Sequence, residues 1–310
     1  MVFTIDSTTD EIVAGLDLAG KVVVVTGASG GLGAETARAI ASTGATVVLV
    51  ARSAEKLEAR RSEIIESTGN TSVHLQVVNL ADLESVRSGA DELLRSFASI
   101  DVLINNAGIM ACPLERTLQG FESQLGVNHI AHFVFTNRLL GALKSDKGGR
   151  IVVLTSGAHK IASVDLDDMN WESREYDKWA AYGASKTANA LFATELNRRF
   201  SSEGITANCV HPGVIMTDLS RSLTEDDFTS IATEGMKFKT VECGAATSVW
   251  AAVSPQLEGQ GGYYLEDCHV GVELPASHML AGYCGYALDN VLAKQLWQKT
   301  EKLLATIRIF

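Results

Sequence analysis

The stretch at residues 21–33 constrains the fold of this chain more than any other. Residues 21–26 read KVVVVT, a continuous β-branched run typical of a strand that is buried on both faces of a parallel sheet. The run leads into a turn, GASGGLG at residues 27–33, and residues 34–43 have a helical composition. A strand, a glycine-rich turn and a helix in this order bind phosphate groups at the start of the helix. We therefore predict that this unit holds the pyrophosphate of a dinucleotide.

The alternation of strands and helices continues along the chain. Apolar runs predict further strands at residues 46–51, 73–78, 101–104, 150–154, 205–210 and 263–265, with helices at residues 54–68, 83–96, 121–143, 181–200 and 241–252. This order predicts an α/β Rossmann fold, a doubly wound parallel sheet of about seven strands with helices on both faces. We place this single domain at residues 21–265, after an N-terminal extension at residues 1–20. Residues 266–310 form a C-terminal extension that we expect to pack on the same domain.

Polar and special residues stand where the predicted strands end. They are the glycine turn, Arg52, Asn79, Asn105, Ser156 and Pro212. In doubly wound sheets, ligands bind beyond the carboxyl ends of the strands. We therefore expect these residues to lie along one edge of the sheet, where a cofactor binds.

The residue after the second strand predicts the type of dinucleotide. In many NAD-binding units an acidic residue at the end of this strand hydrogen-bonds the ribose 2′-hydroxyl. Here the strand ends at Ala51 and the next residue is Arg52. A missing carboxylate and an added guanidinium favour a 2′-phosphate, and Ser29 in the glycine turn offers a further donor. We predict NADP(H), with NAD(H) as the alternative if Arg52 only faces solvent.

Tyr182 and Lys186 form the strongest candidate for an acid–base pair. They are four residues apart in a helical segment, so their side chains lie on one face, one turn apart. A phenol in water has a pKa of about 10, and a nearby ammonium favours its ionised form. We expect Lys186 to lower the pKa of Tyr182, so that the phenol exchanges protons with a substrate oxygen. The same spacing also occurs on ordinary helices, so the assignment depends on the units upstream.

Charge and composition exclude several classes of function. Lys and Arg number 26 against 37 Asp and Glu, and a net charge of −11 without a basic cluster argues against nucleic-acid binding. No apolar run approaches the ~20 residues that span a bilayer, and residues 1–20 do not resemble a signal peptide. The five cysteines are scattered without a C-x-x-C pair. We expect a reduced, cytoplasmic protein without a disulfide framework or metal site.

Several further motifs follow in a fixed order, and together they resemble the classical short-chain dehydrogenase/reductase family over residues 20–265. They are the glycine turn, the NNAG sequence at residues 105–108, Asn128, Ser156, the Tyr182–Lys186 pair, and Pro212 and Gly213 with Thr217. The sequences VNHIAHF at residues 127–133 and SGAH at residues 156–159 look closest to the retinol-dehydrogenase-like and WW-domain-oxidoreductase-like branch.

The resemblance implies a catalytic tetrad of Asn128, Ser156, Tyr182 and Lys186. Tyr182 would exchange a proton with the substrate oxygen, and Ser156 would hydrogen-bond that oxygen. Lys186 would bind the nicotinamide ribose, and Asn128 would hold a water molecule that links Lys186 to solvent. Cofactor contacts are expected from Gly27, Ser29, Gly31, Leu32, Gly33, Arg52, Asn79, Leu80, Asn105, Ala107, Tyr182, Lys186, Pro212, Gly213, Val214 and Thr217.

Two features depart from the compact members of that family. Asn79 stands where the family usually has an Asp near the adenine, which keeps an acceptor oxygen but alters the contacts. The region between Ser156 and Tyr182 is longer than usual, and we expect its segment at residues 165–171 to border the substrate site. Large apolar residues that face either the substrate or the core are Trp171, Trp179, Phe228, Met236 and Phe238.

The resulting hypothesis is an NADP(H)-dependent oxidoreductase that interconverts a carbonyl and an alcohol on an apolar small molecule. An epimerase or dehydratase, or a cofactor-sensing protein without catalytic activity, is the alternative use of such a fold. We also expect a homodimer or homotetramer. In the family, the long helices that hold Asn128 and Tyr182 commonly pair with their counterparts, and a suitable surface is offered by Ala190, Leu191, Ala193, Thr194 and Leu196. The extension at residues 266–310 is the alternative cover for that surface.

Overall fold

The computed structural model describes residues 2–143, 148–225, 227, 235–307 and 309. Its central strand β1 (Val22–Thr26) explains why the first valine run is apolar throughout. Val23 and Val25 pack into the core on one face of the sheet, and Val24 packs into the core on the other. The strand is therefore buried on both faces, as predicted.

Within the described residues, the main sheet has eight strands in the order β10-β9-β6-β5-β4-β1-β2-β3. They are β2 (Thr46–Ala51), β3 (Val73–Val77), β4 (Val102–Asn105), β5 (Gly149–Leu154), β6 (Ile205–His211), β9 (Tyr264–Glu266) and β10 (His269–Val270), together with β1. All neighbours run parallel except β10, which is antiparallel to β9. The seven predicted strands are confirmed, and β10 is an addition at the edge. A separate small sheet pairs β7 (Val214–Ile215) with β8 (Phe238–Lys239).

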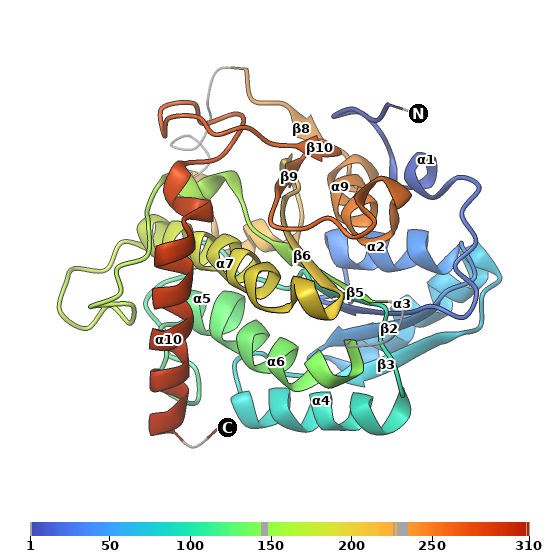
Figure 1. The fold of residues 1–310 in the computed structure, drawn as a ribbon, viewed down its shortest axis with the longest axis horizontal. Helices are drawn as coiled ribbons and strands as arrows, with labels where there is room; N and C mark the ends of the chain where they lie inside the picture. Colours follow the sequence, from blue (N-terminus) through green and yellow to red (C-terminus); the bar gives the residue numbers. More distant parts are fainter. Residues whose placement is uncertain (1, 144–147, 226, 228–234, 308, 310) are drawn as a thin grey trace.

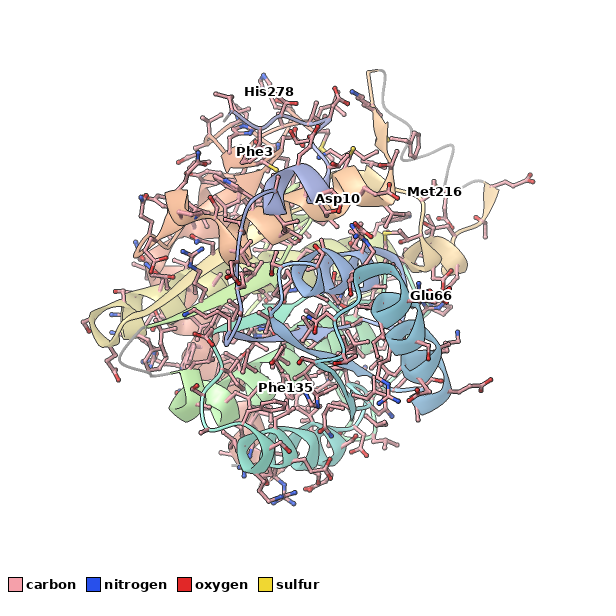
Figure 2. All side chains as sticks on the ribbon, turned by 90° about the vertical axis from the view of Figure 1, so that its right-hand side faces the viewer. Phe3, Asp10, Glu66, Phe135, Met216 and His278 are labelled. Atoms are coloured by element: carbon pink, nitrogen blue, oxygen red, sulfur yellow. The ribbon has the colours of Figure 1, made fainter. Side chains whose placement is uncertain are left out.

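Helices cover both faces of the sheet (Figure 1). One layer contains α4 (Leu83–Ser96), α6 (Ala131–Leu143), α7 (Lys178–Phe200) and α10 (Asn290–Thr306). The other contains α1 (Thr9–Val13), α2 (Gly31–Ala41), α3 (Ala54–Thr68) and α9 (Val241–Val253). In Figure 2, Phe135 marks the first layer, below the sheet, and Asp10 on α1 marks the second layer, above it. In the described part of the chain, no helix combines the length and apolar character that crossing a bilayer requires.

The predicted helix at residues 121–143 has an interruption. It begins as α5 (Ser123–Leu125), widens into a π-helical turn η1 (Gly126–Ile130), and continues as α6. Asn128 lies in this wider turn. π-Helical turns occur frequently at functional sites, where they change the direction of backbone and side-chain groups.

Helix α10 covers the surface that was predicted for a partner molecule. Its Trp297 packs against Phe133 of α6 and Phe192 of α7, with ring centroids 4.7 and 5.8 Å apart. The five α7 residues proposed as the pairing surface are buried within the chain. The C-terminal extension itself buries the apolar faces of both long helices, so the alternative prediction, in which the extension covers this surface, is confirmed. A homo-oligomer would have to use another surface.

Candidate active site

The strand order reverses between β1 and β4, and the glycine turn stands at this point of the sheet edge. Gly27 has φ +70°, and a Cβ atom there would lie 2.9 Å from the Cα of Ala107. At Gly33, a Cβ would lie 2.4 Å from the carbonyl oxygen of Gly27. Helix α2 then begins at Gly31 without a side-chain cap, so its first backbone N–H groups are available to an anion. The turn therefore fits a pyrophosphate.

Thr26 and His132 join the glycine turn to the loop after β4. The Thr26 hydroxyl accepts hydrogen bonds from the backbone N–H groups of Asn106 and Ala107, at 2.9 and 3.0 Å. His132 Nδ1 lies 2.9 Å from the carbonyl oxygen of Asn128, so this nitrogen carries the proton. His132 Nε2, 2.9 Å from Thr26 Oγ1, then accepts from the hydroxyl. Burial lowers the pKa of His132 to about 4, which keeps this single neutral tautomer.

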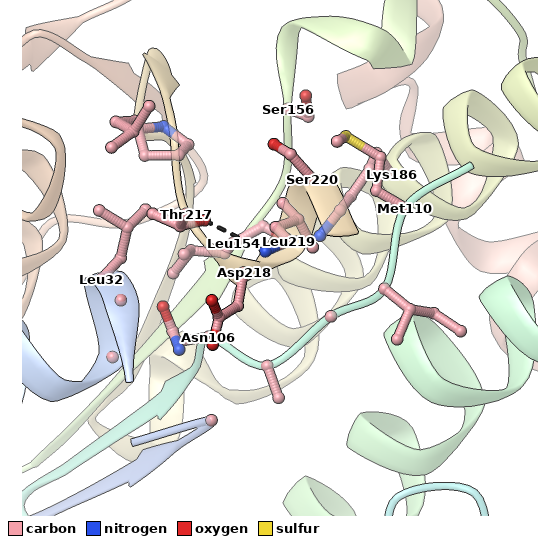
Figure 3. Close-up of a pocket in the computed structure, with 18 of the residues that line it drawn as sticks. Leu32, Asn106, Met110, Leu154, Ser156, Lys186, Thr217, Asp218, Leu219 and Ser220 are labelled. Atoms are coloured by element: carbon pink, nitrogen blue, oxygen red, sulfur yellow. Dashed lines mark hydrogen bonds between the residues drawn. The ribbon is translucent and has the colours of Figure 1, made fainter. Parts of the chain in front are cut away.

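A cleft of about 1200 Å³ follows the carboxyl edge of the sheet. Figure 3 shows Leu32 of the glycine turn near Thr217 on one side of the cleft, and Ser156 and Lys186 on the other. The predicted residues that line the cleft are Gly27, Ser29, Gly31, Leu32, Gly33, Arg52, Asn79, Leu80, Ala107, Ser156, Tyr182, Lys186, Pro212, Gly213, Val214 and Thr217. Asn105 does not line it, because its side chain points into the core and donates to Thr136 Oγ1 at 2.8 Å. Its neighbour Asn106 lines the cleft instead.

Ser156, Tyr182 and Lys186 meet at one end of the cleft. Ser156 follows β5, and its hydroxyl accepts a hydrogen bond from the Ala158 backbone N–H at 3.1 Å. Tyr182 and Lys186 lie one turn apart on α7, and Lys186 Nζ is 5.8 Å from the centre of the Tyr182 ring. Lys186 Nζ also donates to the carbonyl oxygen of Leu154 at 3.2 Å. The predicted pair and the serine therefore share one site.

The pKa of Tyr182 does not move in the predicted direction. Burial raises it to about 12, and a hydrogen bond with Ser156 opposes the change. Burial also lowers the pKa of Lys186 to about 8. Removal from water disfavours phenolate and ammonium alike, and it is the largest cause of both shifts. At neutral pH, Tyr182 is therefore a phenol that can donate a proton, and Lys186 is mostly an ammonium.

Asn128 stands one layer behind the cleft. Its Oδ1 accepts from the backbone N–H of Ile109 at 2.8 Å, and its Nδ2 donates to the Ile109 carbonyl at 3.0 Å and to Ser185 Oγ at 2.9 Å. A Cβ added to Gly108 would lie 3.2 Å from Asn128 Oδ1 and 3.4 Å from Lys186 Nζ. The side chain of Asn128 therefore fixes the loop that passes Lys186, and its amide is already hydrogen-bonded.

Arg52 lies at the opposite end of the cleft from Ser156 and Tyr182. Its side chain is exposed, and the described residues form no ion pair with it. Lys56, one turn into α3, lines the same end together with Ser29 and Ser53. Sequence reasoning missed Lys56, although its spacing from the helix cap Ser53 could have indicated it. Among the residues that the structure describes, these two cations have no carboxylate partner, which favours an anionic group at this end.

Many apolar side chains line the cleft, and Figure 3 shows one of them, Met110, beside Ser156 and Lys186. They include Met110, Ile161, Trp179, Met216, Leu219, Leu223, Met236, Phe238, Met279 and Leu280. Trp171 instead packs against Tyr176, and the segment at residues 165–171 lies outside the cleft. Within that segment, the carbonyl oxygen of Asn170 accepts a hydrogen bond from Arg116. The prediction that it borders the substrate site is therefore wrong. Phe228 is outside the described residues.

Residues 21–227 match the family model of short chain dehydrogenases. The chain belongs to the short-chain dehydrogenase family. Retinol dehydrogenase 13 of Homo sapiens is 38% identical over 290 residues, which cover 92% of this chain and 85% of that protein. The resemblance to retinol dehydrogenases seen in the motifs is thus confirmed.

Solved structures agree with this short-chain dehydrogenase fold. A protein from Mycobacterium paratuberculosis superposes with a TM-score of 0.74 at 34% identity, over 95% of this chain and 97% of that one. A short chain dehydrogenase of Escherichia coli CFT073, solved in complex with NADPH, has a TM-score of 0.64 at 26% identity, over 81% of this chain and 97% of that one. The short-chain dehydrogenase described here is thus an oxidoreductase by family, with the Rossmann fold expected from its sequence.

Proposed function

We propose that this short-chain dehydrogenase is NADP(H)-dependent and interconverts a carbonyl and an alcohol on an apolar small molecule. The observation that carries the proposal is the contrast between the two ends of one cleft. Arg52 and Lys56 stand at one end, and Ser156, Tyr182 and Lys186 stand among apolar side chains at the other.

The glycine turn would hold the pyrophosphate on the N-terminus of α2, where backbone N–H groups are available. Arg52, Lys56 and Ser29 would surround the 2′-phosphate, because all three line that end of the cleft. When bound, the nicotinamide supplies or accepts the hydride. The NADPH complex of the Escherichia coli relative supports the choice of cofactor.

Proton transfer would fall to Tyr182. In the reducing direction its hydroxyl would donate a proton to the carbonyl oxygen as negative charge develops there. The Ser156 hydroxyl would hydrogen-bond the same oxygen and stabilise that charge. The ammonium of Lys186, one helical turn away, would stabilise the phenolate that remains on Tyr182. Since Tyr182 and Lys186 are 3% and 4% exposed, little water would compete with these interactions.

The test compares purified parent protein with Tyr182→Phe, using NADPH and a panel of apolar aldehydes and ketones. We expect loss of the general acid to lower kcat by ~10²-fold or more, with the affinity for NADPH unchanged. The matched control is Tyr263→Phe, since Tyr263 lies outside the cleft and its hydroxyl makes one contact, to Gln260 at 3.4 Å. Parental turnover in Tyr182→Phe, or no turnover by the parent across the panel, would refute the proposal.

A further inference from the structure

Two apolar side chains from the C-terminal extension complete the rim of the cleft. Met279 and Leu280 line its apolar end and are 42% and 49% exposed. They belong to residues 278–282, named here the C-terminal turn, which begins at His278 on the outer edge of the molecule (Figure 2). The turn follows the predicted domain in sequence, yet it forms part of the wall near the catalytic residues.

Lys160 hydrogen-bonds the backbone of the C-terminal turn. Its ammonium donates hydrogen bonds to the carbonyl oxygens of His278 and Ala281, which bracket the two rim residues. Lys160 is only 6% exposed and does not itself line the cleft. A buried ammonium is costly unless its donors are satisfied. Here the backbone of the turn satisfies them, so Lys160 and the turn stabilise one another.

Glu266 holds the other side of the same turn. Its carboxylate accepts the backbone N–H of Gly282 at 2.8 and 3.0 Å. Glu266 is buried at the end of β9, and its negative charge opposes the lowering of the Lys160 pKa by burial. A cation on two carbonyl oxygens and an anion on one N–H therefore fix the C-terminal turn at three points.

His159 connects the turn to the catalytic serine. His159 Nδ1 donates to the carbonyl oxygen of Ser156 at 2.7 Å, since a carbonyl can only accept. His159 Nε2 then accepts the backbone N–H of Cys284 at 3.1 Å. Tyr286 donates through its hydroxyl to the His159 carbonyl at 2.7 Å. These contacts fix the position of Met279 and Leu280 relative to Ser156, where a substrate carbonyl would bind.

We propose that Met279 and Leu280 select substrates with a long apolar chain, and that Lys160 is the positioning residue that keeps them at the rim. The inference rests on the proposed function, since the reacting group would sit at Ser156 and Tyr182. A short aldehyde would be held by the inner part of the cleft alone. A long-chain aldehyde would extend to the rim and bury further methylene groups against both side chains.

The test measures kcat and KM for butanal and decanal with NADPH. Each buried methylene is worth about fourfold in binding, so Met279→Ala with Leu280→Ala should raise KM for decanal about tenfold or more. The values for butanal should stay within about twofold. The control is Leu118→Ala, which trims a leucine that is 76% exposed outside the cleft.

Lys160→Met keeps the aliphatic stem, removes the donors and changes no residue that lines the cleft. It should reproduce the selective loss for decanal, while Lys294→Met on the exposed side of α10 should not. Circular dichroism verifies the fold of each variant. A merely structural role would lower the activity toward both aldehydes together, and that result, or no change in their ratio, would overturn the proposal.

Binding of decanol, measured by calorimetry, separates this inference from the proposed function. If the parent reduces neither aldehyde, the proposed function fails. About tenfold weaker decanol binding by the double variant would still support the apolar wall. Equal decanol binding by the parent and the double variant would refute it.

Discussion

Arg52→Ala should remove most of the preference of this protein for NADPH over NADH. Arg52 follows β2 directly, is exposed toward the cleft, and the described residues offer it no carboxylate partner. A hydrogen bond between charged groups contributes roughly 1.5–3 kcal/mol, or about ten- to over a hundredfold in affinity. Because Arg52 is exposed, solvent screening places its contribution near the lower limit, at about tenfold. Lys56 would then supply a smaller, additional share.

The assay titrates NADPH and NADH into the parent, Arg52→Ala and Lys56→Ala, and follows the fluorescence of the bound dihydronicotinamide. The parent should bind NADPH at least about tenfold more tightly than NADH. Arg52→Ala should weaken NADPH binding and leave NADH binding within about twofold. The control is Arg95→Ala, since Arg95 is exposed on α4 outside the cleft. Higher salt should reduce the preference in the parent, because it screens exposed charges.

Three results would contradict this reasoning. Equal affinities of the parent for NADPH and NADH would show that the Arg52 guanidinium does not contact the 2′-phosphate. If Arg52→Ala still prefers NADPH over NADH, then Lys56 or the backbone of the glycine turn recognises the 2′-phosphate. Equal losses of NADH and NADPH binding would indicate that the substitution disturbs the end of β2.

Two further predictions concern charge and stability. Carbonyl reduction should slow above about pH 8, where Lys186 loses its proton and no longer stabilises a phenolate on Tyr182; a rate that stays constant to about pH 9.5 would contradict this. Trp297→Ala should lower the free energy of unfolding by about 3–5 kcal/mol, because it empties a buried site between α6, α7 and α10 and removes the indole donor to Glu301. Urea denaturation measures this change, with exposed Gln298→Ala as the control, and a loss below about 1 kcal/mol would refute it.

The elements predicted best have a strong local pattern. The bounds of β2, α3 and α4 agree with the prediction at both ends, because β-branched runs and helix caps are written in adjacent residues. The two-residue strands β7, β8 and β10 have too few residues to show a period, so pairing with distant segments decides them. The π-helical turn at Asn128 likewise has no sequence period of its own.

The position of the cleft was predictable because parallel strands bring their carboxyl ends to one edge. The direction in which each side chain points at that edge was harder to predict, as Asn105 and Asn106 show. Both stand at the end of β4, but only Asn106 faces the cleft. The pKa of Tyr182 shows a similar limit, since the charge at Lys186 is visible in sequence and the burial of the phenol is not. Lys160 and His278, 118 residues apart, give no local sign of their contact.

The C-terminal extension supports the candidate site at two separate places. Its turn reaches Lys160 and, through Cys284 and His159, the backbone of Ser156. Its helix α10 packs on α6, which follows Asn128, and on α7, which contains Tyr182. Changes in the turn should therefore alter substrate selection with little loss of stability, whereas changes in α10 should lower stability without altering selection. A variant of the turn that unfolds the protein, or a variant of α10 that changes the ratio of decanal to butanal turnover, would show that these two roles are one.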